Sequence, residues 1–406
     1  MTGRAARHRP SDMRVLVLHN DYRIRGGEEY LVQAVGDTLR AGGVEVVEFR
    51  KQHVHGLYGA ATAFFSGLAN PIAIREVRSL IDAVRPTHAF VENLYPTISP
   101  AVLEPIRKAG VPVVMNIQNF RLACPNGLHY SHGEICTRCL GGREYWCVLR
   151  NCERSMLKST GYALRNAVAR WTGAFTEHVD VFTPPTSFHA RWLTDQGITA
   201  DRIHVIPNMV DDDAGSDCSA TGAYVGFAGR VSPEKGVEVL IEAARRLPNV
   251  PFRIAGSFER MPALPASAPA NVRFLGHLES RELSDFYASA RAVVVPSVWY
   301  EGFPTVIPQA MLRGRPVIAS DIGGLGDVID DGVTGLLFPM GDAAHLAERI
   351  DKVWSDAILA RSMGSAAREK AVREYSRARY FDRLIEAFSA AAERLAETVG
   401  ARVARA

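Results

Sequence analysis

The sequence has little net charge, no long hydrophobic run and no export signal. Its 47 Lys and Arg residues nearly balance 44 Asp and Glu residues, and the resulting charge of +3 disfavours a nucleic-acid-binding protein. The longest uncharged stretch, residues 56–74, is interrupted by small residues and by Pro71, so no membrane-spanning helix is predicted. The basic first residues run into Pro10 and not into an apolar segment, which predicts a disordered tail over residues 1–12 and a cytoplasmic protein.

Apolar segments of strand length alternate with segments of helical length along most of the chain. This alternation predicts an α/β fold with doubly wound parallel sheets, and 406 residues are too many for one core. A stretch rich in Pro, Gly, Ser and Asp (IPNMVDDDAGSDCSATG) breaks the pattern and marks a domain boundary. We therefore expect an N-terminal domain over residues 13–212, a C-terminal domain over 213–378, and a helical segment over 379–406 that packs back toward the first domain.

Residues 295–320 carry the strongest indication of a ligand site. Glu301 follows a predicted buried strand, at the edge of the sheet where ligands bind in open α/β folds. A short helix is expected from Thr305, whose first turn would offer backbone N–H groups to a phosphate. Gln309 is close enough in sequence to border the same pocket. The alternative is an ordinary strand–loop–helix unit with a solvated glutamate.

Two cations follow the first strand of the second domain, in GRVSPEKG. Arg230 and Lys235 would neutralise a diphosphate without a metal ion if both faced the site of Glu301. Alternatively they are two solvated charges in a turn. In the first domain, Gly26 and Gly27 follow the first strand, where glycine lets the backbone approach a ligand.

Five of the six cysteines lie in one irregular insertion, residues 118–155: Cys124, Cys136, Cys139, Cys147 and Cys152. The C-x2-C pair with further thiols nearby satisfies zinc-ligand spacing, and His129 and His132 are substitute ligands. The other interpretation is a set of unliganded thiols in a reducing compartment.

Four segments in fixed order, GRVSPEKGVEVLIEAARRL, FLGHLE, VVVPSVWYEGFPTVIPQAMLRGRPVIAS and DGVTGLLF, resemble the retaining nucleotide-sugar glycosyltransferases of family 4. IPNMVD and RGGEEYLV also fit, so the resemblance covers essentially the whole chain. It implies the GT-B fold, with two Rossmann-like domains around a cleft. It also implies transfer of a hexose from a UDP- or GDP-sugar without a catalytic metal. The acceptor would be a glycan, a lipid-linked molecule or a small molecule. For a lipid-linked acceptor, the segment around Phe64, Phe65 and Leu68 would contact a membrane, with core packing as the alternative.

The resemblance also implies roles for individual residues. Arg230 and Lys235 would hold the donor diphosphate, and Glu301 would face the hydroxyls of the transferred sugar; these three are the candidate catalytic residues. The remaining donor contacts would be Gly26, Gly27, Gly256, Leu278 in the turn at 277–279, the backbone of Phe303 and Thr305, and Gln309. In the insertion, Cys124, Cys136, Cys139 and Cys152 match a subset of these enzymes, so they are the candidate ligands of a structural zinc.

Two residues depart from the family pattern. Gln309 stands where a glutamate normally binds the ribose, and an amide can accept one hydroxyl hydrogen bond and donate another. Gln118, next to Asn119 on the acceptor side, stands where a histidine is usual. Because both residues replace expected groups, an alternative is that this chain is a catalytically silent binding partner of another transferase. A nucleotide-sugar 2-epimerase and a pyridoxal-phosphate-dependent phosphorylase are further alternatives.

Overall fold

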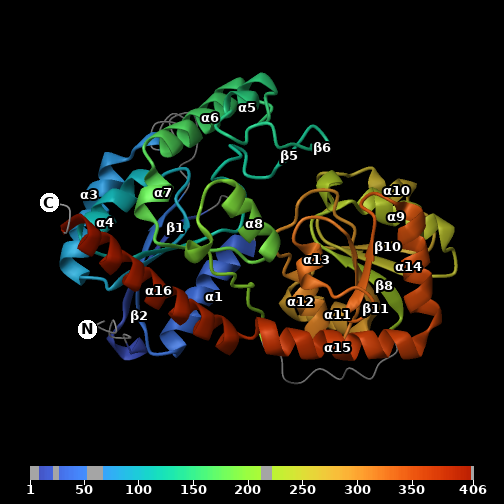
Figure 1. Ribbon diagram of the computed structural model, residues 1–406. Helices are drawn as coiled ribbons and strands as arrows, with labels where there is room; N and C mark the ends of the chain where they lie inside the picture. The colour runs from blue at the N-terminus through green and yellow to red at the C-terminus, as the bar shows by residue number, and fades with distance from the viewer. Residues whose placement is uncertain (1–8, 22–26, 53–66, 212–221, 404–406) are drawn as a thin grey trace.

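The computed structural model describes residues 9–21, 27–52, 67–211 and 222–403. It contains two parallel sheets, each covered by helices on both faces (Figure 1). The predicted α/β class with two Rossmann-like sheets is confirmed. No helix within the described ranges combines the length and the apolar character needed to cross a bilayer.

The N-terminal sheet has the strand order β2-β1-β3-β4-β7. Its strands are β1 (Arg14–Asn20), β2 (Glu45–Lys51), β3 (His88–Asn93), β4 (Val113–Asn116) and β7 (Val181–Thr183). The helices are α1 (Gly27–Ala41), α3 (Pro71–Val84), α4 (Leu103–Lys108), α6 (Met156–Trp171), α7 (Ala174–His178) and α8 (Ser187–Asp195). β1 and β3 are buried almost throughout, as expected for central parallel strands covered on both faces.

The insertion forms a hairpin and a short helix. The strands are β5 (Tyr130–Ser131) and β6 (Glu134–Ile135), and the helix is α5 (Tyr145–Leu149), which lies beside α6. Among the described residues of this half there are also three 3-10 helices: η1 (Pro10–Asp12), η2 (Pro100–Val102) and η3 (Ala200–Arg202). Since η1 immediately precedes β1, the last residues of the predicted tail have regular structure.

The C-terminal sheet has the order β10-β9-β8-β11-β12-β13. Its strands are β8 (Tyr224–Ala228), β9 (Phe252–Ala255), β10 (Val272–Gly276), β11 (Ala290–Val295), β12 (Val317–Ser320) and β13 (Gly335–Phe338). The helices are η4 (Pro233–Lys235), α9 (Val237–Arg246), α10 (Leu264–Ser267), α11 (Ser280–Ser289), α12 (Val306–Leu312), α13 (Leu325–Val328), α14 (Ala343–Ser355) and α15 (Ala357–Tyr375). Asp342 and Asp356 cap α14 and α15 through their carboxylates, which satisfies N–H groups that have no intrahelical partner.

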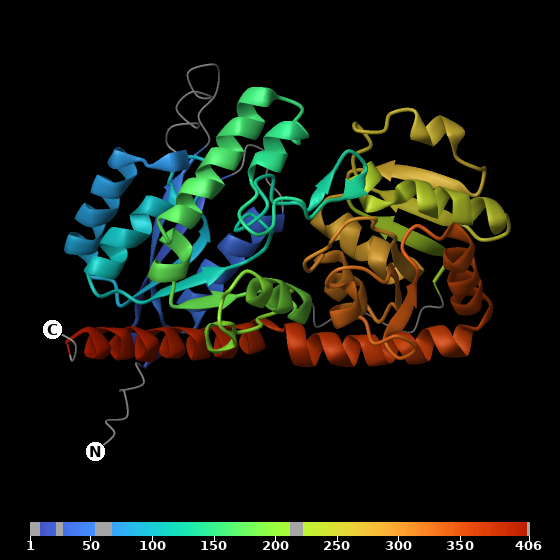
Figure 2. The ribbon, with the colours of Figure 1, turned by 45° about the horizontal axis from the view of Figure 1, so that its top comes forward.

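The last helix, α16 (Arg377–Val403), returns to the N-terminal domain (Figures 1 and 2). Tyr380, Leu384 and Phe388 belong to the same buried cluster as Val15 and Val114 of the first sheet. α16 thus contributes to the core of the N-terminal domain.

The segment from Ile203 to Ile206, which leads toward the C-terminal domain, is mostly apolar but is not a strand. Only Ile203 makes a bridge, to Phe182. Ile206 instead contributes to the cluster that receives α16, so its hydrophobicity reflects burial under a helix.

Candidate active site

Glu301 lies in the loop between β11 and α12 and is 5% exposed. Its Oε1 atom accepts three hydrogen bonds: from Lys235 Nζ at 2.7 Å, Ser297 Oγ at 2.6 Å and Trp299 Nε1 at 2.8 Å. The Lys235 ammonium also lies 5.2 Å from the centre of the Trp299 ring. The structure therefore brings together two of the three candidate catalytic residues.

Two opposing effects set the pKa of Glu301. Burial acts to raise this pKa, but the nearby Lys235 charge and the hydrogen bonds from Lys235, Ser297 and Trp299 outweigh it, and the pKa is lowered. Glu301 is therefore ionised at neutral pH. All three hydrogen bonds are made to Oε1, and Oε2 accepts none from the described side chains.

Close backbone packing holds this loop on the C-terminal domain. Gly236, with φ of +66°, lies so close to Pro296 that an added Cβ would be 1.8 Å from the Pro296 carbonyl oxygen. The N–H of Gly324 donates to the Glu301 carbonyl at 2.9 Å. A side chain at either glycine would displace the loop that carries Glu301.

The third candidate catalytic residue, Arg230, follows β8 and is exposed. It makes no hydrogen bond or ion pair with any residue in the described ranges. Gly256, after β9, is pressed against the same turn, since an added Cβ would be 1.8 Å from the Gly229 carbonyl oxygen. Leu278 is half-buried and packs against the core of this domain. The backbone at Gly256 is thus beside Arg230, while the Arg230 side chain is solvated.

The other predicted donor contacts lie around the start of α12. Phe303 is buried with its ring 5.2 Å from Tyr375, so its side chain belongs to the core and only its backbone could meet a ligand. Thr305 precedes α12 without capping it through its side chain, and Gln309 is half-buried within this seven-residue helix. In the other domain, Gly27 begins α1, whereas Gly26 lies outside the described residues.

The residue before Glu301 contacts the opposite domain. The Tyr300 ring packs against the N-terminal core, 5.1 Å from Phe188, 6.1 Å from Phe120 and 6.3 Å from His129, between ring centres. The backbone N–H of Phe188 also donates to the Asp327 carboxylate at 2.5 Å. These contacts join the two domains next to the loop that carries Glu301.

His189 completes this contact and was not singled out from the sequence. Its ring stacks on Phe120 at 4.5 Å and lies against Gly302, where an added Cβ would be 2.9 Å from His189 Cε1. Burial, with a smaller contribution from His129, lowers the pKa of His189 to about 3, so the ring is neutral. Because the contact joins two distant segments, a single sequence offers no signal for it.

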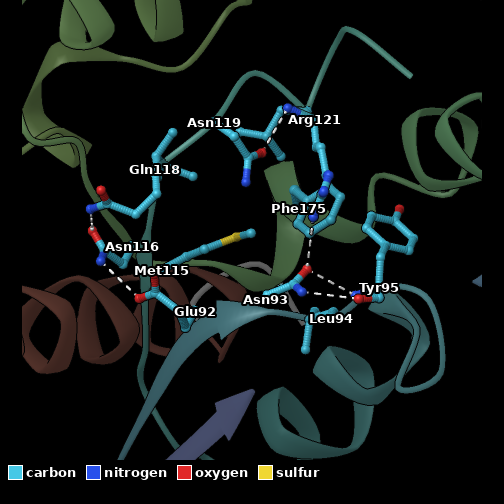
Figure 3. Close-up of a pocket in the computed structure, with 12 residues that line it drawn as sticks. Glu92, Asn93, Leu94, Tyr95, Met115, Asn116, Gln118, Asn119, Arg121 and Phe175 are labelled. Atoms are coloured by element: carbon cyan, nitrogen blue, oxygen red, sulfur yellow. Dashed lines mark hydrogen bonds between the residues drawn. The ribbon is translucent and has the colours of Figure 1, made fainter. Parts of the chain in front are cut away.

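A polar pocket of about 380 Å³ lies at the carboxyl ends of β3 and β4, on the predicted acceptor side (Figure 3). Glu92 accepts a hydrogen bond from Asn116 Nδ2 at 2.8 Å, and Gln118 donates to Asn116 Oδ1 at 3.1 Å. Gln118 also exchanges two hydrogen bonds with Asn208, at 2.8 and 2.9 Å. Asn119 Oδ1 accepts the backbone N–H of Arg121 at 3.1 Å. The Gln118 amide thus connects β4 to the interdomain segment.

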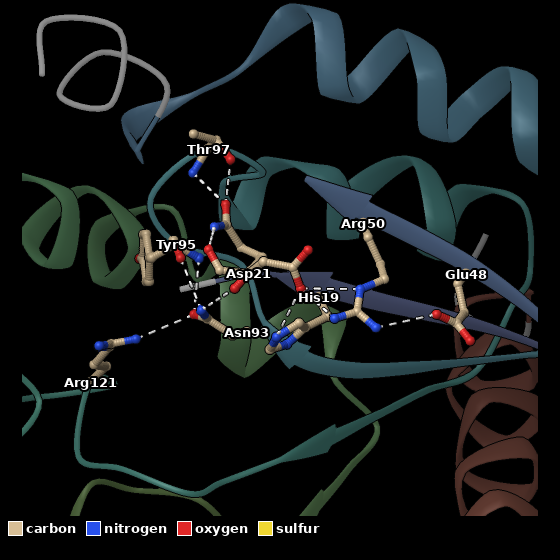
Figure 4. A network of polar contacts seen from close by, with 9 residues as sticks. His19, Asp21, Glu48, Arg50, Asn93, Tyr95, Thr97 and Arg121 are labelled. Atoms are coloured by element: carbon tan, nitrogen blue, oxygen red, sulfur yellow. Dashed lines mark hydrogen bonds and ion pairs between the residues drawn. The ribbon is translucent and has the colours of Figure 1, made fainter. Parts of the chain in front are cut away.

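A second polar network lies beside this pocket, where β1 and β3 end (Figure 4). Asn93 Nδ2 donates to the carbonyl oxygens of Asn20 and Tyr95, both at 3.0 Å, and Arg121 Nη1 contacts Asn93 Oδ1 at 3.4 Å. Asp21 accepts from Arg50 Nε at 3.1 Å. The first sheet therefore presents an edge of amide and charged groups to a ligand.

The five cysteines of the insertion line one small pocket. A hydrogen bond from the Cys147 thiol lowers the pKa of Cys152 to about 6 and raises the pKa of Cys147. Thiol ligands in this number suit zinc, but in the described ranges no three His, Cys, Asp or Glu side chains are grouped as metal ligands. A zinc ion held by Cys124, Cys136, Cys139 and Cys152 therefore stays a prediction.

Comparisons with known families cover both halves of the chain. Residues 2–209, just over half of the sequence, match the family described as "Glycosyl transferase 4-like domain", and residues 214–370 match "Glycosyl transferases group 1". The chain belongs to this glycosyltransferase family. The family resemblance expected from the ordered motifs is thereby confirmed.

Individual relatives align with only part of this glycosyltransferase. The chain is 30% identical to alpha-maltose-1-phosphate synthase of Mycolicibacterium smegmatis over 46% of its own length and 57% of that protein. It is 32% identical to phosphatidyl-myo-inositol mannosyltransferase of Mycobacterium leprae over 42% of this chain and 49% of that protein. Among the first curated relatives, the chain spans between 22% and 57% of the relative's length.

Solved structures share the fold of this glycosyltransferase. Anabaena HepE in complex with UDP has a TM-score of 0.67 and 19% identity, covering 93% of this chain and 100% of that one. Sucrose-phosphate synthase from Thermosynechococcus elongatus has a TM-score of 0.65 and 17% identity, covering 97% and 100%. With the two parallel sheets, these similarities confirm the GT-B fold.

Proposed function

We propose that this glycosyltransferase moves a hexose from a UDP- or GDP-sugar to an acceptor hydroxyl, with retention of configuration and without a catalytic metal. The observation that carries this proposal is the ion pair between the half-buried Lys235 and the buried Glu301, which lies at the carboxyl edge of the C-terminal sheet beside the N-terminal domain. HepE, which shares the fold, was crystallised with UDP and with UDP-glucose.

The pair supplies two functions to a bound donor. Ionised Glu301 would accept a hydrogen bond from a sugar hydroxyl through Oε2, while Oε1 keeps its contacts to Lys235, Ser297 and Trp299. Negative charge grows on the diphosphate as its bond to the sugar breaks. Lys235 and Arg230 would stabilise that charge, and this electrostatic effect is usually the largest catalytic contribution.

Retention follows if the acceptor attacks from the face that the diphosphate leaves. No residue is nominated as a covalent nucleophile, and the departing phosphate oxygen would take the proton of the acceptor hydroxyl. The pocket around Glu92 and Asn116 is the proposed acceptor side. Gln118 would hold that pocket together, because its amide is already engaged by Asn116 and Asn208.

Mass spectrometry of the full chain incubated with a panel of UDP- and GDP-sugars, with and without EDTA, tests the proposal. We expect release of the nucleoside diphosphate from one donor, unaffected by EDTA and reduced in Glu301→Gln but not in Glu259→Gln, a change at an exposed carboxylate of the same domain. NMR of the product reports its anomeric configuration.

Three outcomes would contradict the proposal. Donor binding without turnover across an acceptor panel favours the catalytically silent partner, which the replacements at Gln118 and Gln309 left open. Conversion of the donor to its epimer in the absence of an acceptor favours the 2-epimerase. A product with inverted anomeric configuration would refute retention but not the transfer of the sugar.

A further inference from the structure

Helices α5 and α6 lie side by side (Figures 1 and 2), and several of their large apolar side chains are exposed. Leu157, Leu164 and Trp171 are 66%, 37% and 69% exposed. They are seven residues apart, so they lie along one side of α6. The other large apolar side chains exposed on these helices are Tyr145, Leu149 and Met156.

The inward face of α6 shows that this exposure is not ordinary amphipathic packing. Ser159, Gly161, Ala163 and Ala167 are buried there, together with the polar side chain of Asn166. In a helix that only covers a core, the large apolar residues face inward and the polar ones outward. Here the larger apolar side chains face solvent, which marks an interaction surface.

The same segment also exposes positive charge. Residues 138–171 hold seven Lys or Arg and two Glu, but Arg165 is buried, Arg150 pairs with Glu134, and Arg170 pairs with Glu144. The exposed residues Arg154 and Lys158 make no ion pair with any residue in the described ranges. The apolar stripe formed by Leu157, Leu164 and Trp171 thus begins beside the charges of Arg154 and Lys158.

We propose that α5 and α6 dock this protein onto an anionic lipid bilayer. Trp171 and Tyr145 have the amphipathic rings that favour the interface between headgroups and acyl chains, and Arg154 and Lys158 complement anionic headgroups. A second copy of the chain would place like charges against each other, which disfavours self-association through this face. Of the segment predicted to touch a membrane, Phe64 and Phe65 lie outside the described residues.

Vesicle co-sedimentation of the full chain, without any sugar donor, tests the docking surface. We expect binding to phosphatidylcholine vesicles that contain phosphatidylglycerol, little binding to phosphatidylcholine alone, and a fall in binding as salt is raised. Replacing Arg154 and Lys158 by Ala should weaken binding about fivefold for each charge removed.

The matched test of the apolar stripe is the triple variant Leu157→Gln, Leu164→Gln, Trp171→Gln, which should lose most vesicle binding. The control changes the exposed Ile358, Val372 and Val399 of α15 and α16 to Gln. Circular dichroism should show both variants folded, because every changed side chain is exposed.

Two results would overturn the assignment. Equal vesicle binding by the triple variant and its control would exclude the stripe as the contact. Self-association of the wild type in light scattering, abolished by the triple variant and accompanied by no vesicle binding, would assign the surface to a second copy. Because no donor is present, neither result depends on the proposed transferase activity.

Discussion

Replacing Lys235 by Ala isolates the buried charge of Glu301. The carboxylate would keep its hydrogen bonds from Ser297 and Trp299 but lose the cation 2.7 Å away. Its side chain is only 6% exposed, so water cannot replace the missing charge. Removing one member of a buried pair typically costs about 3 kcal/mol or more, and we expect a loss of unfolding free energy of this order.

The pH dependence of this loss has a definite sign. In the wild type the pKa of Glu301 is lowered, so the pair adds stability above the pKa of an unfolded glutamate and loses it as pH falls through the folded value. In Lys235→Ala, burial acts without the cation and raises the pKa of Glu301. Protonation then relieves the isolated charge, so the stability difference between wild type and variant should narrow from about pH 7 to about pH 4.5.

Urea denaturation at both pH values measures these differences. The matched control is Lys370→Ala, which removes a pair with Asp330 in the same domain, 2.8 Å between charged atoms but with the Asp330 side chain 52% exposed. Because the Asp330 carboxylate that would be left without its cation is solvated, the loss of this pair should cost about 1 kcal/mol or less. The reasoning is refuted if Lys235→Ala costs no more than Lys370→Ala, or if the stability difference widens at low pH.

The proposed donor site gives three further predictions. Arg230→Ala or Lys235→Ala should each lower turnover about 100-fold in a donor-consumption assay, and near wild-type turnover would contradict a diphosphate contact. Gln309→Glu should preserve or strengthen donor binding in titration calorimetry, whereas a large loss would mean that the amide has a task of its own. Protein purified without chelator should contain one zinc by elemental analysis, and metal-free folded protein would favour unliganded thiols.

The sequence alone predicted much of the architecture. The alternation of apolar and helical segments indicated both parallel sheets because β1, β3 and β11 are buried and therefore read as apolar runs. Glu301 and Lys235 could be expected to meet, because both follow strands that end at the same edge of one sheet. β8 and β11 are in fact neighbours in the C-terminal sheet.

What the sequence could not reveal depends on segments that meet only after folding. Gln118 lines the pocket on the predicted acceptor side, and the sequence does not show that its amide is hydrogen-bonded to Asn208, 90 residues away. His189 lies in α8 and packs against Gly302 of the other domain, a contact that forms only when the chain folds. The exposure of Arg230 could not be predicted either. It follows β8 as expected, but its side chain is exposed to solvent.

The loop at residues 300–301 links the proposed donor site to the contact between the domains. Tyr300 packs into the aromatic cluster of the N-terminal domain, whereas the next side chain, Glu301, is held by Lys235 of the C-terminal domain. Gly302 leaves no space beneath His189, and Gly324 holds the Glu301 carbonyl from the other side. Any separation of the domains must therefore either withdraw Tyr300 from its cluster or shift the loop that positions Glu301.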